Sequence, residues 1–109
     1  MKGAGIAEVN GQLIVAVIIN DSVRVHRVKD VKDVKEILST ARPSVLGIDS
    51  SCTNAADELK YLFNSIITSA SDYNGLEEAA GKLIKLNILK SSDYSAIKAA
   101  LSALLRPID

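Results

Sequence analysis

Residues 3–20, GAGIAEVNGQLIVAVIIN, decide the fold, because two apolar runs flank the pair Asn10-Gly11. Asn-Gly between apolar runs is the strongest short-range signal for a β-hairpin, since both residues tolerate the positive φ of a type I′ turn. The segment predicts two antiparallel strands, Gly3 to Val9 and Gln12 to Asn20. In the second strand both alternating faces are apolar, so we expect other elements to cover it on both sides.

The residues that follow the hairpin predict a third strand and a helix. Ser22 to Val28 alternate weakly between apolar and polar residues, which is typical of a strand with one solvated face near the edge of a sheet. Asp30 is suited to cap the next helix, and Arg42-Pro43 ends it, because the residue before a proline avoids the helical conformation.

A short apolar run at residues 45–48, bounded by Pro43 and Asp49, predicts a buried fourth strand. Because it follows a helix, a right-handed crossover places it parallel to an earlier strand, and the first strand is the available partner. The predicted fold class is α/β (α+β). A three-stranded antiparallel meander and a fourth strand parallel to strand one, in spatial order 3-2-1-4, pack with about four helices in a single domain of residues 1–109.

The second half of the chain predicts helices. Apolar residues at helical spacing run from Ala55 to Ile67, with Leu62 and Phe63 on the apolar face, and again from Leu76 to Leu86. Residues 83–89 also alternate, so a fifth strand there is an alternative to the end of that helix. A last helix follows Ser92 and is ended by a proline.

The composition excludes several function classes. Thirteen Lys and Arg balance thirteen Asp and Glu, and this zero net charge argues against attraction of the whole surface to nucleic acid or an anionic membrane. One cysteine cannot form an internal disulfide, which indicates a reducing compartment. The apolar run from Leu13 to Ile19 is too short to span a bilayer, and no signal-peptide core follows Met1. We therefore expect a cytoplasmic protein.

The succession of a hairpin, a third strand, a helix and a fourth strand ending in an acid resembles the ribonuclease H-like superfamily, which includes Holliday-junction resolvases and many transposases. The resemblance implies that acids on strand one, at the end of strand four and near the last helix converge on Mg²⁺ or Mn²⁺, which activates water for phosphodiester hydrolysis. The matching residues are Glu8, Asp49 and Asp93. By this resemblance all three are catalytic, and Glu8 and Asp49 hold the metal.

The chain also departs from the pattern of that superfamily. The first-strand motif usually reads Gly-Ile-Asp, whereas this chain reads Gly5-Ile6-Ala7-Glu8. An acid that moves by one position faces the other side of the sheet, because side chains alternate along a strand. Asp49 is also suited to bind backbone N–H groups in the turn after its strand, and Asp93 stands where any helix start favours an acid. Whether the site is active or has become inactive stays open.

A local cluster of basic residues and histidine indicates nucleic-acid binding in this otherwise neutral chain. Its members are Arg24, His26, Arg27, Lys29 and Lys32. Such side chains contact a phosphate backbone. The alternative is a solvated strand face next to a salt-bridged helix face. Cys52 near a helix start is a further candidate nucleophile, but His26 is the only histidine that could serve as its base.

Two functions therefore stand beside each other. In the first, the chain is a small ribonuclease H-like domain that binds or cleaves nucleic acid with divalent metal. In the second, it is a non-catalytic homodimeric interaction module or a subunit of a complex, since apolar-faced helices leave surface to pair and zero net charge does not oppose association. The relative positions of the Glu8 and Asp49 carboxylates discriminate between them.

Overall fold

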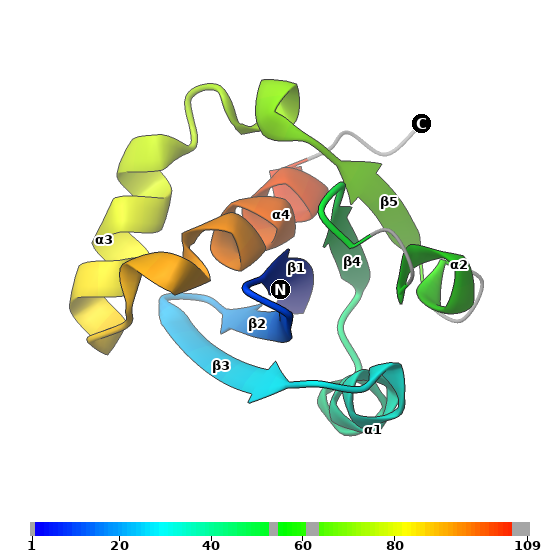
Figure 1. Ribbon diagram of the computed structural model, residues 1–109. Helices are drawn as coiled ribbons and strands as arrows, with labels where there is room; N and C mark the ends of the chain where they lie inside the picture. Colours follow the sequence, from blue (N-terminus) through cyan, green and yellow to red (C-terminus); the bar gives the residue numbers. More distant parts are fainter. Residues whose placement is uncertain (1, 53–54, 61–63, 106–109) are drawn as a thin grey trace.

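The computed structural model describes residues 2–52, 55–60 and 64–105. In these residues five strands form one sheet with the order β3-β2-β1-β4-β5 (Figure 1). In chain order the elements are β1 (Lys2–Val9), β2 (Gln12–Ile19), β3 (Ser22–Val28), α1 (Val31–Ala41), β4 (Val45–Asp49), α2 (Ala55–Leu59), β5 (Ser65–Thr68), the 3₁₀ helix η1 (Ala70–Tyr73), α3 (Glu77–Asn87), the 3₁₀ helix η2 (Ser91–Asp93) and α4 (Tyr94–Leu105).

The predicted fold class and the predicted order 3-2-1-4 are confirmed. β1 and β2 pair antiparallel up to Val9 and Gln12, and both turn residues have the positive φ that the Asn-Gly signal requires, 51° at Asn10 and 79° at Gly11. β4 lies parallel to β1, with Gly3 beside Val45. The helix between them, α1, has Asp30 as its N-cap and ends at a left-handed Arg42.

Helices cover both faces of the sheet, as the two apolar faces of β2 predict. On one face, which we call the α1 face, α1 and α2 pack against even-numbered residues of β1, such as Ala4 and Ile6. On the other, which we call the α4 face, α3 and α4 pack against Ala7 of β1 and Ile14 of β2. Figure 1 shows α4 over the centre of the sheet and α1 on the opposite side.

Two glycines let the backbone of α4 lie directly on the sheet. A Cβ added to Gly5 would lie 2.0 Å from the carbonyl oxygen of Ala96, and one added to Gly47 would lie 2.1 Å from that of Ala99. Real Cβ atoms do not approach backbone so closely, so any larger residue at either position would push the helix away. α4 is thereby placed across β1 and β4.

The predicted helix from Ala55 to Ile67 is wrong in its second half. α2 ends at Leu59, and Ser65–Thr68 form β5, which pairs parallel with β4. The β-branched Ile66 and Ile67 favour a strand, and β5 supplies backbone partners to a buried β4 that would otherwise lack them on that side. The predicted apolar positions Leu62 and Phe63 lie outside the described residues.

Residues 83–89 are the end of a helix rather than a strand. α3 continues to Asn87, and Ile88 takes the left-handed conformation with φ 53°. The amide of Leu89 then donates to the carbonyl oxygen of Ile84 over 2.9 Å, which closes the helix end. None of the helices in the described part of the chain has the length and apolar character needed to cross a membrane.

Candidate functional site

The carboxyl ends of β1 and β4 lie side by side, beside the amino end of α4. One step beyond the paired Ile6 and Ile48, Ala7 comes next to Asp49. Ala7 packs in the core on the α4 face. Gly47 lies against Ala99 of α4, and Asp49, two residues further along β4, is on the same face. Ala7 therefore stands where a Gly-Ile-Asp motif would put its acid.

Glu8 points away from Asp49. Its strand neighbour Ile6 and its cross-strand partner Leu13 both belong to the core on the α1 face, and side chains alternate, so Glu8 extends on that face. Its side chain is exposed, and its backbone N–H donates to the hydroxyl of Ser51 over 3.0 Å. The carboxylates of Glu8 and Asp49 thus leave the sheet on opposite faces.

Asp49 is held by hydrogen bonds within the fold. The hydroxyl of Tyr73 donates to Asp49 Oδ1, and the backbone N–H of Ser51 donates to Oδ2 over 3.0 Å. Because the single Tyr73 proton is directed to Asp49, the buried hydroxyl of Thr68 donates to the Tyr73 oxygen, 2.7 Å away. Burial raises the pKa of Tyr73, and the bond to Asp49 raises it further, so the phenol keeps its proton. This network ties the end of β4 to η1.

A lysine of α4 stands beside the same network. Lys98 Nζ lies 5.3 Å from the centre of the Tyr73 ring and 4.6 Å from that of Tyr94. An ammonium over the faces of two aromatic rings is stabilised by their negative π-surfaces. Like charges repel, so this ammonium disfavours a further cation nearby.

Asp93 is fully buried and pairs with Arg27 of β3 rather than facing Asp49. Both of its carboxylate oxygens accept from Arg27 Nη2 of β3, at 2.7 and 2.6 Å, and Oδ2 also accepts from the backbone N–H of Lys90 at 3.1 Å. β3 and β4 are separated by β2 and β1 in the sheet, so Asp93 reaches toward the β3 side while Asp49 lies on β4. The pair joins the start of α4 to an edge strand.

These positions do not fit a divalent metal shared by the predicted acids. Glu8 and Asp49 extend from opposite faces, Ala7 supplies no ligand, and Asp93 is neutralised by Arg27. Among residues 2–52, 55–60 and 64–105, no group of three or more His, Cys, Asp or Glu lies close enough to hold a metal ion. The convergence that the family resemblance implies is therefore not present at this end of the sheet.

Cys52 does not have the character of a nucleophile. Its side chain is buried with the core on the α1 face, and burial, aided by the charges of Asp49 and Glu8, raises the pKa of its thiol from 9.0 to about 12. A thiol acts as a nucleophile only as the thiolate. His26, its candidate base, is exposed on β3 and lines the groove between α1 and the sheet.

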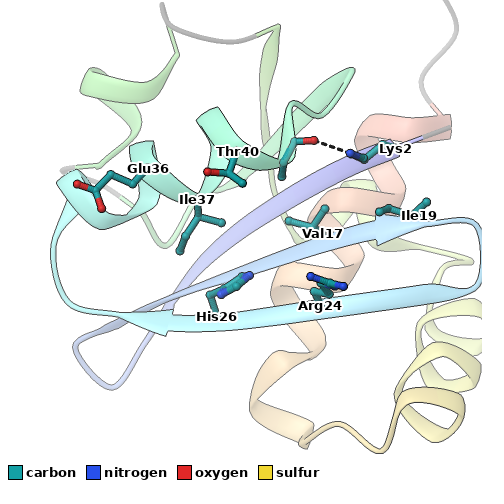
Figure 2. Close-up of a pocket in the computed structure, with 9 residues that line it drawn as sticks. Lys2, Val17, Ile19, Arg24, His26, Glu36, Ile37 and Thr40 are labelled. Atoms are coloured by element: carbon teal, nitrogen blue, oxygen red, sulfur yellow. Dashed lines mark hydrogen bonds between the residues drawn. The ribbon is translucent and has the colours of Figure 1, made fainter.

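That groove encloses about 530 Å³ between α1 and the exposed part of β2 and β3 (Figure 2). It is lined by Lys2, Val17, Ile19, Arg24, His26, Glu36, Ile37, Thr40 and Ala41. Arg24 and His26 project into it side by side from β3, and Lys2 Nζ donates to the carbonyl oxygen of Ala41 over 2.6 Å. We call this feature the basic groove.

The structure brings together only part of the predicted basic cluster. Arg24 and His26 line the groove, and Lys29 follows β3 as an exposed residue. Lys32 is one helical turn before Glu36 and so continues the same side of α1. Arg27 alternates onto the α4 face and pairs with Asp93, which removes it from the cluster. Sequence reasoning missed Glu36 and Thr40, although their spacing of four residues on a predicted helix placed them on one side.

Comparison with known proteins agrees with the topology. No family model matches the sequence, and no curated protein matches it. Among solved structures, the chain is similar to RuvC of T. thermophilus, solved in complex with a Holliday junction substrate, with a TM-score of 0.64 over 94% of this chain and 91% of that chain. The chain has a ribonuclease H-like fold. Sequence identity to that structure is 16%, so the likeness shows the fold and nothing beyond it.

Proposed function

We propose that this chain, as a single domain, binds nucleic acid through the basic groove and does not cleave it by a metal-dependent mechanism. The observation that carries the proposal is the groove itself, where Arg24, His26 and Lys2 come from two strands to one exposed concave surface. Such donors are the groups that contact phosphate and sugar in protein–nucleic acid complexes.

Exposed cations extend the groove at the end where β3 leads into α1. Lys29 lies in that connection, and Lys32 lies on the first turn of α1, one turn before the groove residue Glu36. Because the chain has no net charge, its attraction to a polyanion is local to this surface. With three or four phosphate contacts, a plot of the logarithm of the binding constant against the logarithm of the salt concentration should have a slope of about −3.

The positions of the acids support binding without metal-dependent cleavage. A catalytic role was predicted for Glu8, Asp49 and Asp93, but Glu8 extends on the α1 face, Asp49 accepts from Tyr73, and Asp93 pairs with Arg27. Ala7 stands at the third position of the Gly-Ile-Asp motif, where the acid would be. RuvC of T. thermophilus, the similar structure described above, was solved with a Holliday junction substrate, which supports including a four-way junction among the ligands tested.

The test is fluorescence anisotropy with a labelled single strand, a duplex and a four-way junction, at about 50 to 200 mM salt. Arg24→Glu reverses a charge in the groove, and Lys82→Glu makes the same change on exposed α3, on the other face of the sheet. We expect Arg24→Glu to weaken binding about tenfold or more and Lys82→Glu to change it little. Equal losses in the two variants would refute the assignment to the groove.

One observation favours a second candidate, the homodimeric interaction module. Leu86 and Ile88 at the end of α3 are 68% and 92% exposed, and Ile88 holds a left-handed conformation that costs a β-branched residue about 1 to 2 kcal/mol. Exposed apolar side chains in a strained segment are typical of contact surfaces. Light scattering that reports only a monomer, for wild type and Ile88→Asp alike, would exclude this candidate.

A further inference from the structure

We propose that Arg24 and His26 hold an unstacked base of a single-stranded nucleic acid between their planar side chains. This inference rests on the proposed function and names its ligand class. The two residues are separated by one position on β3 and share the face that lines the basic groove. Figure 2 shows the two side chains next to each other along β3, with His26 below Ile37 of α1 and Arg24 below Val17 of β2.

The spacing of the two residues matches the thickness of a stacked base. A strand rises about 3.2 to 3.4 Å per residue, so side chains two residues apart on one face are about 6.5 to 6.8 Å apart. Successive nucleotides of one strand are about 3.4 Å apart along the axis of a duplex, which is the thickness that one stacked base occupies. The gap between Arg24 and His26 therefore has room for one base, once the two side chains turn their planes toward it. Guanidinium and imidazole groups both stack on bases in complexes with unpaired nucleic acid.

The rest of the groove offers the surfaces that a nucleotide needs. Val17 and Ile19 of β2 and Ile37 of α1, on the opposite wall, give the groove an apolar lining, and Ile19 is 39% exposed. The volume of about 530 Å³ lies in the range of small-molecule sites, about 300 to 1,000 Å³. Ordinary pockets of this kind combine an apolar lining with a few polar groups that fix the ligand's orientation.

Both walls of the groove also carry polar groups. Across the groove from β3, Glu36 offers carboxylate oxygens and Thr40 a hydroxyl, which are partners for the donors at a base edge. Lys2 uses one N–H bond on Ala41, and an ammonium has three, so two donors stay available for a phosphate. The groove thus carries groups suited to the face, the edge and the backbone of a bound single strand.

An unpaired strand suits this arrangement better than a duplex does. Bases in a duplex are stacked on each other and paired, so one could enter between Arg24 and His26 only after it had left the helix. Bases of a single strand are free to be splayed out, at much smaller cost. An acidic peptide would satisfy the charge of the groove but has no planar group to fill the space between the two side chains.

The decisive variant keeps the charge and removes the plane. Arg24→Lys retains a cation that contacts phosphate, but it loses the guanidinium face. Arg42→Lys, at the exposed residue that ends α1, is the matched control. Each protein is titrated as the full chain, by fluorescence anisotropy, with a labelled oligothymidylate, the same backbone carrying abasic sites, and a duplex. Both substituted side chains are exposed, and circular dichroism checks that each variant folds.

We expect Arg24→Lys to weaken binding of oligothymidylate by about fivefold or more, with little change for the abasic strand or the duplex, and Arg42→Lys to change none of the three. His26→Gln should show the same selective loss. If Arg24→Lys binds oligothymidylate as wild type does while Arg24→Glu binds weakly, the stacking site is refuted and the phosphate contact stands. If polyglutamate displaces oligothymidylate as well as unlabelled oligothymidylate does, the groove recognises charge alone and the stacking site is also refuted. If wild type binds none of the ligands, the proposed function fails.

Discussion

Replacing Arg27 by methionine tests whether Asp93 is a structural residue. Within the described part of the chain, three hydrogen bonds reach the Asp93 carboxylate, two from Arg27 and one from the backbone of Lys90. Asp93 has no exposed surface, so Arg27→Met leaves a buried carboxylate whose remaining partner among these residues is the Lys90 N–H. Removing one member of a buried ion pair costs about 3 to 5 kcal/mol. The Arg27 side chain is 31% exposed, so water partly solvates the site, and we expect the free energy of unfolding to fall by about 2 to 3 kcal/mol.

Urea denaturation followed by circular dichroism measures this loss. Small domains are stable by about 5 to 15 kcal/mol in total, so the midpoint should move clearly while the slope stays the same. Asp93→Asn in the Arg27→Met background removes the stranded charge, and the double variant should be more stable than the sum of the two single changes predicts. A loss below about 0.5 kcal/mol for Arg27→Met would equal that of a surface pair and would refute the structural role.

Three further predictions concern the packing and the titration of the core. Gly5→Ala should lower the free energy of unfolding in urea by several kcal/mol, because its methyl group would meet the Ala96 carbonyl. Gly81→Ala on α3, where the nearest atom is 3.9 Å away, should raise it by about 0.5 to 1 kcal/mol. Equal effects of the two substitutions would contradict the close placement of α4. Tyr73→Phe should cost about 1 to 3 kcal/mol by removing the hydroxyl that a buried threonine and a carboxylate both contact, and an unchanged midpoint would show that this network adds nothing. Burial raises the pKa of Cys52 from 9.0 to about 12, so above pH 9 the unfolded chain releases a proton that the native chain keeps. The free energy of unfolding should therefore fall by up to about 1.4 kcal/mol per pH unit. Cys52→Ala should lose this dependence between pH 9 and 10, and an equal slope in the two proteins would contradict the prediction.

The sequence predicted those parts of the fold that depend on local signals and on connection rules. Asn10-Gly11 fixed the hairpin, and the helix between the third and fourth strands required a parallel crossover. β5 was missed because Ile66 and Ile67 fit helical spacing as well as a strand, and only the unpaired edge of β4 decides between them. The choice between helix and strand for such a segment is set by its tertiary contacts rather than by its local sequence.

The sequence also predicted part of the candidate site, where the prediction depended on local alternation and not on contacts between distant residues. The opposite orientation of Glu8 follows from the one-residue shift in Gly5-Ile6-Ala7-Glu8, because side chains alternate along a strand. The pairing of Asp93 with Arg27 joins residues 66 positions apart, and no local pattern indicates it. The basic groove was found through Arg24 and His26 alone, since its other wall depends on how α1 lies over the sheet.

The most direct test of the account is a combined binding and cleavage assay with a labelled four-way junction, in Mn²⁺ and in EDTA. In each condition Asp49→Asn should give the same anisotropy curve as wild type, and the strands should stay intact on a denaturing gel. Cleavage in Mn²⁺ that both EDTA and Asp49→Asn abolish would contradict the account.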